Sequence, residues 1–283
     1  MVTPGHVKTD DEHRQEICEV GRWLHERCYV AATDGNLSVR LDDRRILATP
    51  TAISKGMMQP DDLTIVDYEG KRVLGRRNVS SEIAMHLLIY KRRPDVNAVV
   101  HAHPPVATGY AAAGLPLNKA LISEIVISLG CVPIAQYGTP GTPELSQAMA
   151  ELIPRYDAIL MANHGVVTYG SDLMNAYFRM ETVEHFARIS LVTELIGRQV
   201  LLSQSDVDKL MEARRRYGIT TEFARNESCP VTDGARELEP HRETHAHHAG
   251  CGCAAGDKDD KIVLTREELE ALIGETVRSL KVG

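Results

Sequence analysis

The sequence lacks any stretch of about 20 apolar residues, the length that a membrane-spanning helix requires. It also lacks a surplus of basic residues, because 32 lysines and arginines stand against 39 aspartates and glutamates, for a net charge of −7. A chain with this balance has no excess positive charge with which to hold nucleic acid or an anionic membrane. Neither partner is expected, and the first residues show no charged segment followed by an apolar run that would indicate a secretory signal.

Cysteine is also scarce. Six cysteines in 283 residues do not make the disulfide framework of a small secreted protein. We therefore expect a reducing, cytoplasmic setting, with Cys18, Cys28 and Cys131 as small core residues. The remaining composition, 43% hydrophobic and 25% charged, is typical of a globular protein with a buried core.

Charge and apolar periodicity divide the chain into three regions. From Glu222 onward there are 13 acidic and 8 basic side chains, so this last part carries −5 of the total charge. Residues 222–261 show almost no apolar periodicity and contain scattered glycine and proline, which predicts a flexible linker. Residues 262–283 carry an apolar stripe at helical spacing after a capping box, which predicts an amphipathic helix. Residues 1–221 form the main domain.

The main domain mixes predicted helices with predicted strands. Helical periodicity and start and stop signals favour helices over residues 10–30, 80–92, 144–152, 173–196 and 205–217. Short apolar or alternating runs favour strands over residues 37–41, 46–48, 61–68, 98–101, 125–129, 133–135, 158–161 and 166–167. This mixture predicts a layered α/β or α+β domain.

Three histidines follow apolar runs that are predicted to be strands. His101 and His103 are two residues apart, so in a strand their side chains point to the same face. His164 follows a second strand, and Glu82 offers a carboxylate at the start of a predicted helix. Any one of these histidines alone would more readily be a hydrogen-bonded core residue. Together they favour a catalytic Zn²⁺ site, for which three imidazoles and an open position are suitable.

A second group of residues is suited to an anion. It combines a tight turn, a Thr-Pro-Thr loop and a Ser-Ser pair before a helix, and it consists of Gly35, Asn36, Thr51, Ser80 and Ser81. The N-terminus of a helix offers N–H donors and a partial positive charge to a phosphate. Simple N-capping by a serine is the alternative, and the two roles are compatible. Lys55 could add a charge, although a solvated loop lysine is the more ordinary interpretation.

Six motifs in this order resemble the class II aldolase/adducin family, from about residue 10 to Ile219. They are Asp34-Gly35-Asn36-Leu37-Ser38, Thr49-Pro50-Thr51, Ser80-Ser81-Glu82, Val100-His101-Ala102-His103, Tyr137-Gly138-Thr139-Pro140-Gly141-Thr142 and Asn163-His164-Gly165. The resemblance implies a three-layer α/β/α sandwich around a largely antiparallel sheet. It also implies a homotetramer with active sites at the subunit interfaces.

The resemblance also implies roles for individual residues. His101, His103 and His164 correspond to zinc ligands, and Glu82 to a carboxylate that can bind the metal and act as base. The phosphate cradle would consist of Gly35, Asn36, Thr51, Ser80 and Ser81. The sequence departs from the family pattern at Ile122, where an interface tyrosine is expected, while Tyr217 matches a second family tyrosine near the end of the domain.

The implied activity is zinc-dependent cleavage of a ketose 1-phosphate. L-Fuculose 1-phosphate or L-rhamnulose 1-phosphate would give dihydroxyacetone phosphate and lactaldehyde. A pentulose-phosphate 4-epimerase or a sugar-phosphate dehydratase of the same fold remains an alternative, although the epimerase tends to carry aspartate in place of Glu82. A non-catalytic, adducin-like interaction domain is the alternative from another class, and such domains have lost the metal histidines.

The tail has its own interpretations. A complete enzyme, a flexible linker and a terminal amphipathic helix together resemble enzymes that carry an encapsulation peptide for a bacterial microcompartment. Residues 262–283 would then bind a shell protein, and the alternative is docking onto the chain's own domain or a neighbouring subunit. Four histidines and two cysteines within residues 241–253 could bind a metal, but a linker with incidental metal affinity is favoured.

Overall fold

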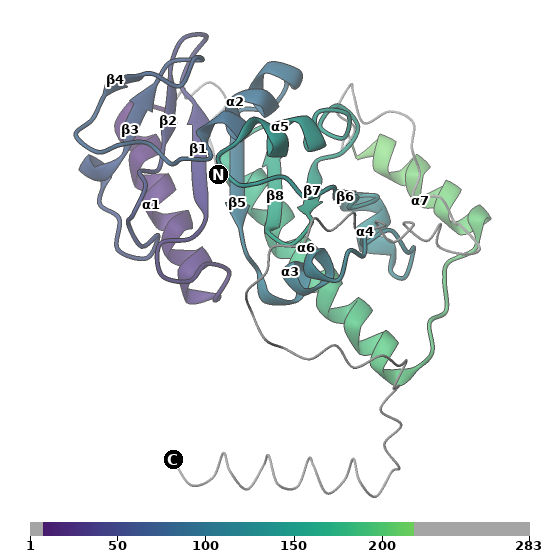
Figure 1. The fold of residues 1–283 in the computed structure, drawn as a ribbon. Helices are drawn as coiled ribbons and strands as arrows, with labels where there is room; N and C mark the ends of the chain where they lie inside the picture. Colours follow the sequence, from purple (N-terminus) through teal and green to yellow (C-terminus); the bar gives the residue numbers. More distant parts are fainter. Residues whose placement is uncertain (1–7, 218–283) are drawn as a thin grey trace, which may run out of the picture. The chain divides into compact units, whose positions relative to one another are not determined.

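The computed structural model describes residues 8–217, and within them eight strands form one sheet in the order β4-β3-β2-β1-β5-β8-β7-β6 (Figure 1). The strands are β1 (Asn36–Arg40), β2 (Ile46–Ala48), β3 (Thr64–Val66), β4 (Arg72–Leu74), β5 (Ala98–Ala102), β6 (Ile134–Ala135), β7 (Ala158–Met161) and β8 (Gly165–Gly170). Every neighbouring pair is antiparallel except β6 and β7, which run parallel. The expectation of a largely antiparallel sheet is confirmed.

Helices cover both faces of this sheet. They are α1 (Asp10–Glu26), α2 (Ile83–Arg92), α3 (Pro105–Ala112), α4 (Ser123–Ser128), α5 (Pro143–Met149), α6 (Leu173–Ile196) and α7 (Gln204–Arg216), with a short 3₁₀ turn at Pro60–Asp62. Helices α1, α3 and α6 pack in one core cluster with one face, and α2 and α5 pack in a second cluster with the other. The structure is therefore the expected three-layer sandwich.

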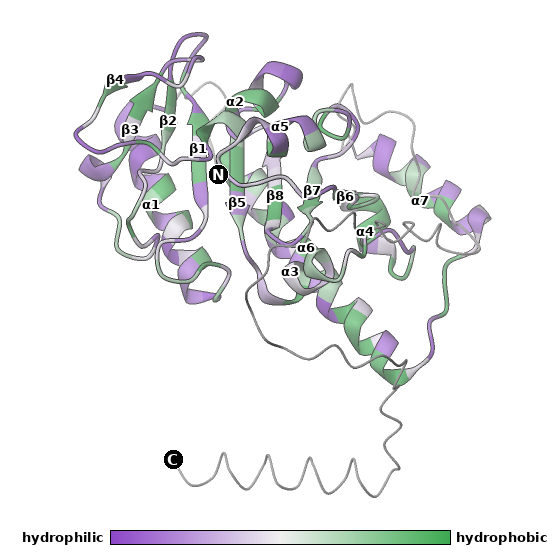
Figure 2. Ribbon diagram, viewed as in Figure 1, coloured by the Kyte–Doolittle hydropathy of each residue, from purple (hydrophilic) through white to green (hydrophobic). Residues whose placement is uncertain are grey.

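The alternation of side chains along β5 shows how the strands serve both layers. Val100 belongs to the cluster under α6, while its neighbour Val99 belongs to the cluster under α2. Successive side chains of a strand point to opposite faces, so His101 shares the face of Val99. Figure 2 shows that the hydrophobic residues follow these central strands. A strand covered on both sides must be apolar throughout, so a buried histidine in β5 requires a specific reason.

Capping explains where the two longest helices begin and end. In α1, Thr9 and Glu12 form a reciprocal capping box. Asp172 caps the start of α6, and Gly197 ends it in the left-handed conformation with φ of 75°. The ends of α6 agree with the sequence-based prediction, and α1 ends four residues before the predicted limit. Among residues 8–217, no helix is both long enough and apolar enough to cross a membrane.

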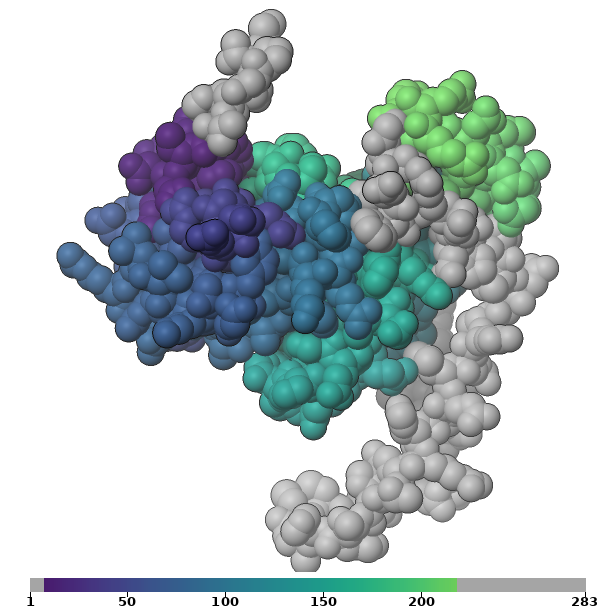
Figure 3. All heavy atoms as spheres, turned by 90° about the horizontal axis from the view of Figure 1, so that it is seen from above, coloured from purple at the N-terminus to yellow at the C-terminus, as the bar shows by residue number. Residues whose placement is uncertain are grey.

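One predicted strand is wrong. Residues 125–129 carry β-branched side chains that favour a strand, but α4 occupies residues 123–128. Its Ile125 enters the main core, and Val126 packs with Val207 of α7 in a third small cluster. Packing on two sides thus outweighs the local β preference. Figure 3 shows α7, in green, on the side of the molecule away from the purple and blue N-terminal elements.

Other predicted boundaries need smaller corrections. Within residues 61–68 only β3 is a strand, and the 3₁₀ turn Pro60–Asp62 precedes it. The helix predicted from residue 80 begins at Ile83. Strand β4 and helix α3 were not predicted. The predicted linker, residues 222–261, and the predicted helix, residues 262–283, lie outside the described residues.

A buried carboxylate joins three helices to the sheet. Asp157, just before β7, is 1% exposed and lies 2.8 Å from Arg93 Nη2 and 2.9 Å from Arg179 Nη2. The guanidinium of Arg214 on α7 lies 3.9 Å from the same side chain. These arginines belong to the end of α2, to α6 and to α7. Breaking a buried ion pair by removing one partner commonly costs about 3–5 kcal/mol, since the other charge stays buried.

We expect Asp157→Asn to lower the free energy of unfolding by about 3 kcal/mol or more, because the amide keeps the shape but removes the charge shared by three guanidinium groups. Urea unfolding of the purified chain measures the change. Asp208→Asn on the exposed side of α7 is the control and should change stability by no more than about 0.5 kcal/mol. Equal stability of the two variants would contradict this account.

Candidate active site

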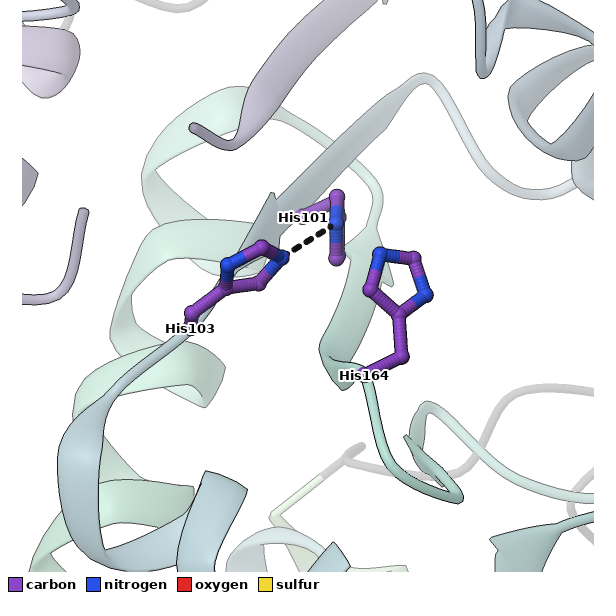
Figure 4. Close-up of side chains that lie close together, drawn as sticks. All are labelled: His101, His103 and His164. Carbon is purple, nitrogen blue, oxygen red and sulfur yellow. Dashed lines mark hydrogen bonds between the residues drawn. The ribbon is translucent and has the colours of Figure 1, made fainter. Parts of the chain in front are cut away.

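Three histidines converge where β5 ends and β8 begins. His101 is on β5, His103 follows that strand, and His164 lies in the turn between β7 and β8 (Figure 4). One ligand atom from each ring lies within 4.8 Å of the others. Strands β5 and β8 are paired with His101 opposite Val167, so the sheet brings His164 beside the other two. The three histidines that the sequence singled out therefore lie together.

The hydrogen bonds of His101 fix its tautomer. Its Nδ1 lies 2.8 Å from the carbonyl oxygen of Val166, which can only accept, so Nδ1 carries the proton. The lone pair is therefore on Nε2, which faces His103 Nε2 at 3.1 Å. Ligating histidines are commonly oriented by such a bond from the other ring nitrogen. His101 is thus prepared to bind a cation through Nε2.

Burial keeps these rings in the form that binds metals. His101 is fully buried, and burial lowers its pKa to about 3. Burial and the neighbouring His164 also lower the pKa of His103. A neutral imidazole has the lone pair that a metal ion needs, whereas an imidazolium has none. At neutral pH His101 and His103 can therefore act as ligands without first losing a proton.

Glu82 completes the group. Its carboxylate lies 3.4 Å from His101 Nε2 and 3.2 Å from His164 Nε2, and its buried Oε1 has no hydrogen-bond partner. Burial raises the pKa of Glu82, but His101, His164 and a hydrogen bond from Asn36 outweigh burial and lower it. The carboxylate is ionised at neutral pH. Three imidazoles and an unsatisfied carboxylate oxygen form a donor set that fits Zn²⁺.

A buried chain of hydrogen bonds runs from Tyr90 on α2 to Glu82. Asn36 Nδ2 donates to Glu82 Oε2 at 2.7 Å, so Asn36 Oδ1 must accept from His86 Nε2. His86 Nδ1 then accepts from Ser38 Oγ at 2.7 Å, and Ser38 accepts from Tyr90 at 2.8 Å. Each group behind Glu82 is at most 4% exposed. The chain therefore has one direction, with every donor pointing towards the carboxylate.

Close backbone approaches at two glycines make this arrangement possible. Gly35 has φ of 72°, and a Cβ atom there would lie 2.8 Å from the carbonyl oxygen of His101. At Gly165 a Cβ atom would lie 2.5 Å from Cδ2 of His103. A side chain at either position would displace the ends of the strands that carry the histidines.

The residues predicted to hold phosphate share one cavity with Glu82. The cavity has a volume of about 280 Å³, and its lining includes Gly35, Asn36, Thr51, Ser80, Ser81, Glu82, His103 and His164. A bridge between Pro50 and Val79 holds the threonine and serine loops together. Ser80 Oγ accepts from the backbone N–H of Glu82 at 3.3 Å, but Glu82 itself is the N-cap of α2 and no side chain caps this helix, so the capping alternative does not hold. The predicted metal and anion groups thus face the same space.

Two expectations about single residues are wrong. Lys55, expected to be solvated, is 1% exposed and lines this cavity. Cys28, expected in the core, is exposed, whereas Cys18 and Cys131 are buried as expected. Cys28 follows the end of α1 with φ of 59°, in a turn that leaves its side chain outside.

Two residues singled out in the sequence lie away from the cavity lining. Tyr217 follows α7 and is 71% exposed. Ile122 precedes α4 and packs, partly buried, against the main core. His86 was not singled out, since a lone histidine within a helix gives no functional signal. Its position six residues after Ser80 and its place on the α2 face were the only indications.

Comparison with known proteins identifies the family. Residues 15–191 match the model for the class II aldolase and adducin N-terminal domain. The chain is 36% identical over 185 residues to a 3-oxo-tetronate 4-phosphate decarboxylase of Haemophilus influenzae, covering 64% of this chain and 88% of the relative. It is 31% identical over 210 residues to a 5-deoxy-D-ribulose 1-phosphate aldolase of Bacillus thuringiensis, covering 73% and 97%.

A solved structure agrees. An L-fuculose 1-phosphate aldolase superimposes with a TM-score of 0.68 at 32% identity, covering 75% of this chain and all of that one. The sequence motifs, the three-layer sheet and these similarities agree. The chain belongs to the class II aldolase and adducin family, and the relatives named here are enzymes.

Proposed function

We propose that this protein is a zinc-dependent aldolase that cleaves a ketose 1-phosphate to dihydroxyacetone phosphate and a small aldehyde. The observation that carries the proposal is the shared cavity, in which His103, His164 and Glu82 face the hydroxyls of Thr51 and Ser80. Phosphate held by the hydroxyls would place the adjoining carbonyl carbons beside the histidines. L-Fuculose 1-phosphate and L-rhamnulose 1-phosphate are the proposed substrates, with lactaldehyde as the second product.

Each group of the site has a proposed task. His101, His103 and His164 would hold Zn²⁺, which would supply Lewis acidity for the negative charge that develops when the C–C bond breaks. Glu82, ionised and held by Asn36, moves the proton between substrate and solvent. Gly35, Asn36, Thr51, Ser80 and Ser81 bind the phosphate, whose binding energy is remote from the reacting carbons. Tyr217 is proposed as a further catalytic residue.

A decarboxylase is the second candidate, and the similarity to the Haemophilus enzyme favours it. Loss of CO₂ from a 3-oxo-tetronate 4-phosphate leaves the enediolate of dihydroxyacetone phosphate, the same species that aldol cleavage of a ketose 1-phosphate leaves. The phosphate, carbonyl and hydroxyl therefore need the same contacts in both reactions. Only the departing group differs between the two reactions. A pentulose-phosphate 4-epimerase or a dehydratase needs the same groups.

A single assay panel separates these candidates. The zinc-loaded protein is supplied with L-fuculose 1-phosphate, L-rhamnulose 1-phosphate, 5-deoxy-D-ribulose 1-phosphate, a 3-oxo-tetronate 4-phosphate and L-ribulose 5-phosphate. Aldolase activity releases dihydroxyacetone phosphate with an aldehyde, and decarboxylase activity releases it with CO₂. Epimerisation changes the sugar without either product. Turnover of none of them, in protein that retains its metal, would contradict the proposal.

We further propose the division into a catalytic domain (1–221), a linker (222–261) and a terminal helix (262–283), with the catalytic domain in a homotetramer. The homotetramer is proposed from the resemblance of the sequence motifs to the family. Confinement of the enzyme in a bacterial microcompartment would keep a reactive aldehyde product from other proteins.

Removal of one histidine should remove the metal. In His101→Ala, His103→Ala or His164→Ala, we expect bound zinc and turnover to fall together, because two imidazoles make a poor chelate. Metal analysis of the purified protein and the aldolase assay measure both. His185→Ala removes an exposed histidine elsewhere and should change neither. A site variant with full zinc and normal turnover would reduce that histidine to a structural role.

Glu82→Gln should keep the fold and lose most of the rate. The amide retains the shape of the carboxylate but cannot accept a proton, and loss of a general base commonly lowers a rate by about 100- to 10,000-fold. Steady-state kinetics on the preferred substrate measures the loss. Glu124→Gln is the comparison, since Glu124 is the next carboxylate to consider. A near-normal rate for Glu82→Gln would place the base elsewhere.

The terminal segment can be tested apart from catalysis. Residues 262–283 fused to a fluorescent protein should co-purify with microcompartment shell proteins of the host, and Leu272→Glu with Leu280→Glu should abolish this, since both changes place charge on the apolar stripe. If the fusion binds no shell protein and the truncated enzyme loses its tetramer, the segment instead docks on the enzyme itself.

A further inference from the structure

Lys55 is a buried cation that the proposed reaction does not use. It is 1% exposed, and its Nζ donates to the carbonyl oxygens of Thr33 at 2.8 Å and Ile53 at 2.7 Å. Lys55 forms no ion pair with any of the residues 8–217. An ammonium has three protons to donate, and burying it without an opposite charge is costly. Its surroundings among the described residues therefore provide two hydrogen-bond acceptors but no carboxylate at ion-pair distance.

The position of Lys55 suggests what supplies the missing charge. It lines the same cavity as Thr51, Ser80 and Ser81. Among the described residues that line this cavity, Lys55 is the only lysine or arginine. Every other donor from the loops here is a hydroxyl, an amide or a backbone N–H. A dianion in the cavity would therefore find one full positive charge from the protein, and that charge is Lys55.

Its two bonds also fix the walls of the cavity. Thr33 precedes the Gly35 turn, and Ile53 follows the Thr51 loop, so one ammonium ties both loops. The backbone at Lys55 is itself seated against α1, because a Cβ atom at Gly21 would lie 2.8 Å from the carbonyl oxygen of Lys55. The charge is thus held in place before any ligand arrives, which lowers the cost of binding.

The link between the two loops does not by itself require a charged side chain at this position. Two carbonyl oxygens can be satisfied by a neutral amide or by water at the edge of a cavity. Burial lowers the pKa of Lys55 to about 8, so keeping this ammonium charged costs the folded protein free energy. Asp34 is the acidic neighbour that favours the charged form, without reaching ion-pair distance.

We propose that Lys55 is the cation that balances a bound phosphate dianion in this cavity and makes the site select phosphate monoesters over uncharged sugars. The inference rests on the proposed function only in taking phosphate as the ligand's handle. Inorganic phosphate is the probe, so that binding is measured without turnover.

Calorimetric titration of the full-length, metal-loaded protein with inorganic phosphate tests the inference. Lys55→Met should raise the dissociation constant at least tenfold, while Lys119→Met, which removes a half-exposed lysine outside the cavity lining, should change it less than twofold. A folded Lys55→Met protein that binds phosphate within twofold of the unaltered protein would overturn the proposal. If Lys55→Met loses phosphate binding as expected but the unaltered protein turns over no sugar phosphate, the proposed function alone would be overturned.

A second measurement does not depend on the variant folding. Sulfate remains a dianion between about pH 7 and 9.5, and the other ionisable side chains that line the cavity are those of Asp34, Glu82, His103 and His164. Sulfate affinity of the unaltered protein should therefore fall at least tenfold over this interval as the Lys55 ammonium loses its proton. Affinity that stays constant across the interval would overturn the proposal.

Discussion

Holding a carboxylate beside three imidazoles is the constraint on which the rest of this structure depends. Such a group is stable only if each polar atom has a fixed partner. The structure meets this with the chain from Tyr90 through Ser38, His86 and Asn36 to Glu82. Because each donor points towards Glu82, the amide of Asn36 has one orientation. The elements α2, β1 and β5 must keep their mutual positions for this to persist.

The two faces of the sheet differ because only one of them holds the polar groups around Glu82. The face under α1, α3 and α6 is almost wholly apolar and fixes the strands. The face under α2 carries His101 and its partners, where β5 is still covered on both sides. The reacting groups then open into the cavity only at the strand ends. Rigid strands position the ligands, and loops supply the hydroxyls, so chemistry and substrate binding can vary separately.

The features that the sequence predicted correctly are those with local signals. Two histidines at i and i+2 on an apolar run specify a shared face, and α6 carries a cap at each end. The strand predicted over residues 125–129 is wrong because their β-branched side chains are accommodated in a helix only when α7 packs against them. Lys55 and His86 could not be assigned from the sequence because the residues that they contact lie far away along the chain. Thr33 lies 22 residues from Lys55, and Asn36 lies 50 from His86.

The pairing of β5 with β8 would give a metal ion bound at the three histidines a role in folding. His101 is opposite Val167, and a slip of one residue between these strands would turn the histidine to the far side of the sheet. The three rings would then no longer meet. An ion that binds only when they meet stabilises only the correctly paired sheet, by an amount that grows with its concentration relative to its dissociation constant. A cation bound by the three histidines would thus favour the correct register of two strands that are distant in sequence.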